Sequence, residues 1–146
     1  MALQTHRLRS LFQGLSLAWG MLSMLTMSRK ILLIEDHADC RDILALQARA
    51  VGYEIIEAET GADGVDKAFR ELPDLIVMDL KMPGVDGVEA TKRIKVNPQT
   101  RHIPIIVNTA WVVKDRMEEA LAAGATMVLT KPESFHLLND LLRQFQ

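Results

Sequence analysis

The chain has few residues of several kinds, and each scarcity narrows what the protein can be. Cys40 is the single cysteine among 146 residues, which excludes an intramolecular disulfide and fits a reducing compartment such as the cytoplasm. The net charge is only −2 and no basic stripe occurs, so nothing in the composition favours binding to nucleic acid. The histidines share no metal-ligand spacing with one another or with Cys40, and we interpret them as surface or loop residues: His6, His37, His102 and His136.

The remaining composition is typical of a globular protein. About half of the residues are apolar (49%) and a quarter are charged (25%). A chain of this length fits one domain and is large enough to bury a hydrophobic core.

The first 27 residues differ in composition from the rest of the chain. They contain no acidic residue, and no charge occurs between Ser10 and Ser28. Their apolar residues recur at the spacing of one helix face: Leu8, Leu11, Phe12, Leu15, Trp19 and Leu22.

Four interpretations of this segment compete. A signal peptide would need a small-residue cleavage site, which is missing, and a membrane span would be short and diluted by polar residues. An amphipathic helix that lies on a membrane or binds a partner is the alternative to a segment outside the fold. We expect residues 1–27 to be an extension outside the fold, with Met27 placed like a natural start, and residues 28–146 to form the folded domain.

From Lys30 onward, strand-like and helix-like patterns alternate. Five such units predict a parallel sheet with helices on both faces, because right-handed crossovers place them there. The expected strands are 31–35, 53–57, 73–79, 103–108 and 127–130, and the expected helices are 37–51, 62–71, 88–95, 112–123 and 134–145.

Two of the expected helices show an apolar face, and each has a residue that marks its end. In helix 37–51 the face is Ile43, Leu44, Gln47, Ala48 and Val51, and in helix 62–71 it is Val65, Ala68, Phe69 and Leu72. Gly52 and Gly124 follow predicted helices as C-terminal capping residues.

Polar residues stand where four of the expected strands end. Asp79 closes a buried strand, Glu35 and Asp36 close another, and Thr109 and Lys131 follow two more. The carboxyl ends of parallel strands meet at one edge, so three carboxylates, a hydroxyl and an ammonium should converge there. That set suits a divalent cation and a phosphoryl group.

Simpler explanations exist for some of these residues. Glu35 and Asp36 are also favourable at a helix N-terminus, Thr109 could be a β-branched packing residue, and Lys131 could be a surface lysine at a turn. Asp79, an acid after four consecutive apolar residues, has few such explanations.

The motifs in order resemble the receiver domain of two-component response regulators, of the single-domain, chemotaxis-regulator-like kind. They are Glu35-Asp36, Asp79 followed by Met82-Pro83-Gly84-Val85-Asp86-Gly87, Thr109-Ala110 and Lys131-Pro132. The resemblance covers residues 29–146 and implies a flavodoxin-like, doubly wound, five-stranded parallel sheet of order 2-1-3-4-5 with five helices.

The resemblance also implies roles for these residues. Asp79 would be the phosphoacceptor, and Lys131, the Thr109 hydroxyl and the Ala110 N–H would bind the phosphoryl oxygens. Mg²⁺ or Mn²⁺ would be held by Asp36, Asp79 and the backbone carbonyl of Lys81, with Glu35 acting mainly through water. Pro132 after Lys131 fits a cis peptide bond.

The chemistry independently calls for these residue types. A carboxylate is already ionised at neutral pH and needs no general base to attack phosphorus. Its approach to a phosphate beside two other acids is opposed by charge repulsion, which a cation with oxygen ligands removes. Without metal, the clustered acids should raise at least one carboxyl pKa.

The chain departs from the family pattern in its last strand. Val128 stands where family members usually carry an aromatic residue that couples phosphorylation to output, so output should depend on the 109–115 loop and the following helix. Trp111 and Lys81 are bulky residues beside the expected pocket. Trp111 would either shield an acyl phosphate from water or serve a partner interface.

The expected function is therefore a stand-alone, cytoplasmic receiver that is a signalling switch and not an enzyme. It would take a phosphoryl group from a histidine kinase or histidine phosphotransfer protein and signal by contact with a downstream protein, since no effector domain is expected. Kinase docking would use His37, Arg41, Asp42, Ala45 and loop 132–135, and output would use segments 112–123, 127–130 and 134–145.

Two other functions are alternatives for a chain with these residues. One is a phosphorylation-independent binding module of this fold, which a missing acid or lysine would favour. The other is a phosphatase with an aspartyl-phosphate intermediate, which would carry a second acid at the position of Lys81. Membrane contact would arise only if residues 1–27 form an amphipathic helix.

Overall fold

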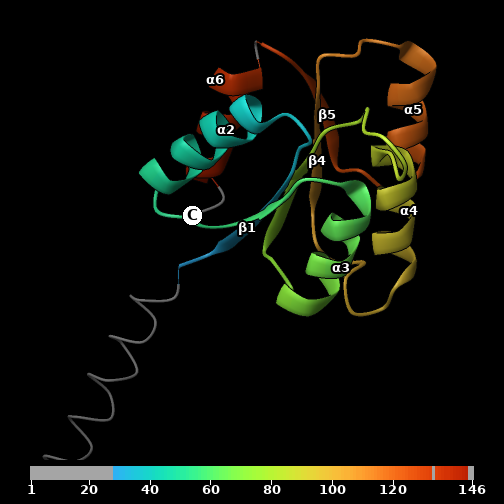
Figure 1. Ribbon diagram of the computed structural model, residues 1–146, viewed down its shortest axis with the longest axis horizontal. Coiled ribbons are helices and arrows are strands. Elements are labelled where there is room, and N and C mark those ends of the chain that lie inside the picture. Colours follow the sequence, from blue (N-terminus) through green and yellow to red (C-terminus); the bar gives the residue numbers. More distant parts are fainter. Residues whose placement is uncertain (1–27, 133, 145–146) are drawn as a thin grey trace, which may run out of the picture.

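The computed structural model describes residues 28–132 and 134–144, so the predictions for residues 1–27 lie outside it. Five parallel strands form one sheet in the order β2-β1-β3-β4-β5 (Figure 1). The strands are β1 (Lys30–Ile34), β2 (Glu54–Ala58), β3 (Leu75–Met78), β4 (Ile105–Thr109) and β5 (Met127–Thr130). This order confirms the fold that the resemblance implied.

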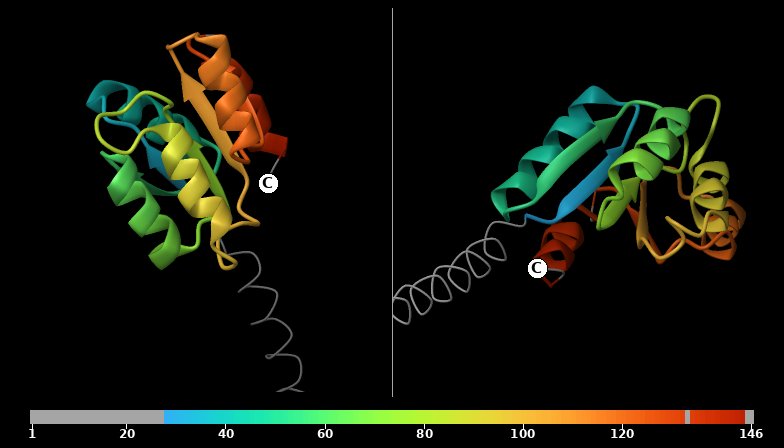
Figure 2. Two further views of the ribbon diagram at one scale, coloured as in Figure 1. Left: turned by 90° about the vertical axis from the view of Figure 1, so that its right-hand side faces the viewer. Right: turned by 90° about the horizontal axis from the view of Figure 1, so that it is seen from below.

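Helices cover both faces of the sheet. Helices α2 and α6 lie on one face and α3, α4 and α5 on the other, as Figure 2 shows from two further sides. Their bounds are α2 (Ala38–Ala50), α3 (Gly61–Glu71), α4 (Gly87–Val96), α5 (Lys114–Ala122) and α6 (Ser134–Gln144). None of the helices in these two described ranges is long and apolar enough to cross a membrane.

The sheet separates two hydrophobic cores, because successive strand residues point to opposite faces. In β1, Leu32 and Ile34 pack toward α3 and α4, whereas Ile31 and Leu33 pack toward α2 and α6. All four are at most 1% exposed. Burying each such side chain contributes about 1.5–3 kcal/mol. The central strands are thus fixed from both sides, and so are the positions where they end.

The helix ends follow the expected local chemistry. The Thr60 hydroxyl accepts a hydrogen bond from the Asp63 N–H, and an Asp86 oxygen accepts one from the Glu89 N–H, which caps α3 and α4. Helix α2 ends at Ala50 with Val51 as its C-cap, and Gly52, with a φ of 94°, follows Val51 in the left-handed position, which confirms the predicted capping glycine.

The predicted helix faces were wrong at two residues. Leu72 is 51% exposed, because α3 ends at Glu71 and Leu72 takes a left-handed conformation (φ 46°) ahead of Pro73. Ile43 is 48% exposed, because Ala45 occupies the buried face of α2 beside Leu44. In addition, α5 begins at Lys114, two residues later than expected.

Gly87 lets helix α4 approach the chain segment that carries Asp79. A Cβ atom at this position would lie 2.5 Å from the Asp79 carbonyl oxygen and 2.8 Å from the Leu80 Cα. The Gly87 N–H also donates to the Leu80 carbonyl at 2.8 Å. Because these neighbours are backbone atoms, they cannot move aside as a flexible side chain would.

Gly87→Ala should therefore destabilise the protein by about 1–3 kcal/mol, although alanine is the better helix former. Urea denaturation followed by circular dichroism measures the change. Gly84→Ala is the comparison: it meets no atom within 4 Å and bears only the cost of its left-handed φ of 73°. A Gly87→Ala protein as stable as the wild type would contradict this close approach.

Candidate functional site

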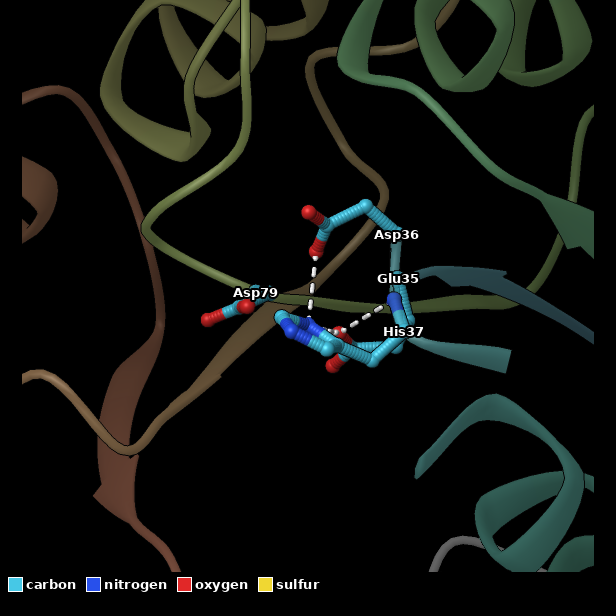
Figure 3. Close-up of side chains that lie close together, drawn as sticks. All are labelled: Glu35, Asp36, His37 and Asp79. Atoms are coloured by element: carbon cyan, nitrogen blue, oxygen red, sulfur yellow. Dashed lines mark hydrogen bonds and ion pairs between the residues drawn. The ribbon is translucent and has the colours of Figure 1, made fainter. Parts of the chain in front are cut away.

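Three carboxylates meet at the carboxyl edge of the sheet (Figure 3). Ile34 and Met78 are paired in register at the ends of β1 and β3, so the acids that follow them, Glu35 and Asp79, are neighbours. The Asp79 N–H donates to the Ile34 carbonyl at 2.9 Å, which fixes this spacing. One carboxylate oxygen from each of Glu35, Asp36 and Asp79 lies within 4.8 Å of the others.

Asp79 carries a buried carboxylate that is only partly satisfied. Asp79 is 7% exposed, and its Oδ1 atom is buried without a hydrogen-bond partner in the described part of the chain. Burial raises the pKa of Asp79, and the charge of Glu35 raises it further. Lys131 and the N–H groups of Leu80 and Lys81 act in the opposite direction but do not outweigh these effects.

Lys131 lies directly after β5 and reaches into the same cluster. Its Nζ donates to Glu35 Oε2 at 2.7 Å, and the two side chains are 10% and 2% exposed. Burial lowers the pKa of Lys131, but the hydrogen bond to Glu35 and the charge of Asp79 outweigh it, so the pKa is raised overall. The Lys131–Pro132 peptide bond is cis, as predicted. The pairing of Lys131 with Glu35 itself was not anticipated from the sequence.

Thr109 ends β4 beside Lys131, whose N–H donates to the Thr109 carbonyl at 2.8 Å. The Thr109 side chain is fully buried, and its Oγ1 accepts a hydrogen bond from the Trp111 N–H at 3.0 Å. Ala110 is exposed, and Trp111 is 37% exposed. Lys81 Nζ lies 5.3 Å from the centre of the Trp111 ring, a cation–π contact between the loops after β3 and β4.

Val128, which stands at the position of the aromatic residue expected from the resemblance, lies in β5. It pairs in register with Val107 and packs against the core on the α3, α4 and α5 side. Its side chain is partly buried.

His37 belongs to the cluster, which the sequence interpretation missed. Its Nδ1 lies 3.2 Å from Asp36 Oδ1 and 3.4 Å from Glu35 Oε1 (Figure 3). The prediction that His37 is a surface residue is correct, since its side chain is 73% exposed. Its position directly after two acids was the only signal in the sequence that it could join them.

The donor atoms fit a hard divalent cation. Carboxylate oxygens are the ligands that Mg²⁺ prefers, and Asp79 Oδ1 accepts no hydrogen bond from the residues that the structure describes. Among the same residues, Asp36 Oδ1 likewise accepts no hydrogen bond, and it lies 3.2 Å from His37 Nδ1. A cation here would also offset the repulsion that raises the pKa of Asp79.

Asp79→Asn should raise the free energy of unfolding in metal-free buffer at neutral pH. Because the folded-state pKa of Asp79 lies above its unfolded value of about 3.9, the folded protein binds this proton more tightly. The stability that the proton contributes is present below the unfolded pKa and is lost as the pH rises through the folded pKa. The advantage of the variant should therefore grow with pH.

Urea denaturation from about pH 3.5 to pH 7 with a chelator measures this advantage. Asp66→Asn, at an exposed position on α3, is the control for losing one surface charge. An Asp79→Asn protein with the same advantage at every pH would contradict the raised pKa.

Known proteins are similar to this chain in sequence and in architecture. The family model of the response regulator receiver domain matches residues 31–143. The polar-differentiation response regulator DivK of Brucella ovis is 34% identical over 119 residues, which are 82% of this chain and 97% of DivK. The response regulator PleD of Caulobacter vibrioides is 37% identical over 106 residues, 73% of this chain but only 23% of PleD. The chain thus spans about a quarter of the length of PleD.

Solved structures agree with these relatives. The chemotaxis protein CheY4 of Vibrio cholerae has a TM-score of 0.74 and 28% identity, covering 82% of this chain and 99% of its own. The receiver domain of the sensor histidine kinase PA1611 from Pseudomonas aeruginosa has a TM-score of 0.74 and 31% identity over 81% of this chain and 97% of its own. That structure contains a magnesium ion coordinated in the active-site cleft. The chain therefore belongs to the response regulator receiver family of two-component phosphorelay signalling.

Proposed function

We propose that residues 28–146 form a receiver domain that accepts a phosphoryl group on Asp79 and signals by changing its contacts with a partner protein. The donor is a histidine kinase or a histidine phosphotransfer protein, and the transfer depends on Mg²⁺. The unpartnered, buried Asp79 Oδ1 is the observation that carries this proposal, because it lies among two further acids with Lys131 close by.

The acids of the site have separate tasks in this proposal. Asp36, Asp79 and the Lys81 carbonyl would hold the cation, with Glu35 acting mainly through water. When bound, Mg²⁺ neutralises the acids and orients the phosphoryl group. The Asp79 carboxylate attacks phosphorus, a new O–P bond forms, and the P–N bond to the donor histidine breaks with the electron pair leaving on nitrogen. No general base is needed, because the nucleophile is an anion.

Lys131, Thr109 and Ala110 bind the transferred phosphoryl oxygens. Lys131 has three N–H groups and directs one to Glu35, so the others remain for the phosphoryl group. The Thr109 oxygen accepts from the Trp111 N–H, which leaves the hydroxyl hydrogen free to donate. The Ala110 N–H supplies a further donor. Positioning and charge stabilisation of this kind are the main contributions a protein makes to phosphoryl transfer.

An ion pair connects the site to a helix of the proposed output surface. Asp86 caps α4 through Oδ1, and its Oδ2 lies 2.5 Å from Arg116 Nη2 on α5. Because Val128 cannot rotate a ring, we infer that output proceeds through the 109–115 loop and α5. A shift of the loop after Asp79 is passed to α5 by Asp86 and Arg116.

The proposed partners follow from the same surfaces. The kinase or phosphotransfer protein docks on the start of α2, with His37, Arg41 and Asp42 exposed or partly exposed there, and on segment 132–135. Ala45, which the sequence analysis placed on this surface, is buried (1% exposed) and is not part of it. The proposed location is the cytoplasm. Turnover beyond slow self-hydrolysis is not expected, because Lys81 and not an acid stands two residues after the nucleophile.

Incubation of the protein with acetyl phosphate and Mg²⁺ should add one phosphoryl group, seen by intact-mass spectrometry. The addition should disappear with a chelator and in Asp79→Asn, and it should persist in Asp66→Asn as a matched control on α3. A wild-type protein that takes up no phosphoryl group, or an Asp79→Asn protein that still does, would refute phosphoacceptance at Asp79. The first result would favour a phosphorylation-independent binding module.

Trp111 stands where it can limit access of water to an acyl phosphate. Its ring contacts Lys81 across the site, and together they connect the two loops that border Asp79. Excluding water slows the hydrolysis of a reactive intermediate.

Trp111→Ala should shorten the half-life of the phosphorylated protein by about threefold or more, measured by loss of the phosphoryl mass over time. Val112→Ala, at a neighbouring position that is 65% exposed, is the control and should leave the half-life near the wild-type value. An unchanged half-life in Trp111→Ala would assign this tryptophan to a partner interface instead.

A further inference from the structure

The imidazole of His37 is unusual because it contacts two acids of the site and caps no helix. His37 is the N-cap residue of α2, but its side chain makes no capping hydrogen bond to that helix. Serine, threonine, aspartate or asparagine would normally provide one. The ring instead bends back, with Nδ1 3.2 Å from Asp36 Oδ1 and 3.4 Å from Glu35 Oε1 (Figure 3).

We propose that His37 is a nitrogen ligand of the cation site, which makes the site bind imidazole-preferring transition metals such as Ni²⁺, Zn²⁺ and Cu²⁺ more tightly than the acids alone would. The inference rests on the proposed function only in using the same acidic site. It concerns which divalent ion the site holds, and phosphoacceptance by Asp79 does not require it.

The distances suit one ion that Asp36, His37 and Asp79 bind directly, with Glu35 close enough to act through water. Donor atoms at about 2.1 Å from an octahedral ion are about 3.0 Å apart when adjacent and about 4.2 Å apart when opposite. One donor atom from each of Glu35, Asp36, His37 and Asp79 lies within 4.8 Å of the other three. Small side-chain adjustments therefore bring Asp36, His37 and Asp79 into coordination, and the exposed His37 ring has room to make them.

The buried carboxylate supports the inference independently of His37. Asp79 is 7% exposed, and its unpartnered Oδ1 is a strong acceptor inside the cluster. A carboxylate in that state is stabilised by any cation. The imidazole adds selectivity, because nitrogen is a favourable ligand for Zn²⁺, Cu²⁺ and Ni²⁺, whereas Mg²⁺ prefers oxygen.

The main rival explanation is that His37 only forms an ion pair with Asp36. Both explanations place the ring beside the acids, but they differ in what its removal does. As a ligand, His37 strengthens binding of nickel and hardly affects magnesium. As a positive partner of the acids, it would oppose both cations, so its removal would strengthen the binding of both.

The test is calorimetric titration of the full chain, without a histidine tag, with NiCl₂ and separately with MgCl₂ at one fixed pH. His37→Phe should lower the Ni²⁺ affinity by about tenfold or more and change the Mg²⁺ affinity by less than about twofold. His102→Phe, at another exposed histidine, is the matched control and should leave both affinities unchanged.

Electron paramagnetic resonance of bound Cu²⁺ gives a direct signature of the ligand. Nitrogen splitting should be present in the wild type and in His102→Phe and lost in His37→Phe, whose folding is checked by circular dichroism. Equal Ni²⁺ affinity in wild type and His37→Phe would overturn the inference, as would stronger binding of both ions in the variant. Nickel binding that survives in Asp79→Asn at full strength would also overturn it, since the ion would then lie elsewhere.

These outcomes are separable from a failure of the proposed function. Phosphorylation of the wild-type protein with acetyl phosphate and Mg²⁺ involves no nickel. It can succeed while the nickel titration shows no role for His37, which refutes only the inference. Conversely, absence of phosphorylation together with a His37-dependent nickel affinity would refute the proposed function and leave the metal site in place.

Discussion

The 2.7 Å pair between Lys131 and Glu35 holds together a site that would otherwise be dominated by repulsion. Three carboxylates crowd the end of β1 and β3, and two of the residues that carry them, Glu35 and Asp79, are almost fully buried. One ammonium cannot neutralise three acids. The pKa of Asp79 is raised, first by burial and then by the nearby negative charge of Glu35. Any further positive charge at this site, whether a metal ion or a proton, therefore stabilises the folded protein.

The sheet supplies the rigidity that this crowding requires. β1 and β3 are buried on both faces, so the residues at their ends cannot move apart to relieve the repulsion. Gly87 brings α4 against the backbone of Asp79, which closes off another direction of relaxation. Like charges that the surrounding structure holds close together, with shifted pKa values, are common at functional sites. The loops are different: Trp111 and Lys81 contact each other in exposed positions and can rearrange.

Much of the fold followed from periodicity. The apolar runs at 31–34 and 75–78 predicted strands buried on both faces, and the alternation with helices predicted a parallel sheet. The errors occurred where a single residue decides the local geometry. Leu72 fitted the apolar pattern of α3, but the helix ends at Glu71 because Leu72 precedes Pro73. Ile43 fitted the pattern of α2 equally well, and only packing against α6 and the sheet showed which face is buried.

The residues at the carboxyl edge of the sheet could be predicted from the sequence alone, because local patterns mark the strand ends and parallel strands all end on one side. That was enough to gather Glu35, Asp36, Asp79, Thr109 and Lys131 in one place. How these side chains pair depends on the three-dimensional fold. Lys131 reaches Glu35 across 96 residues of sequence, and the His37 ring turns toward the acids and not toward its own helix. These contacts depend on distances of a few ångströms between side chains from different loops. Local sequence patterns do not contain those distances, so the contacts could not be predicted from them.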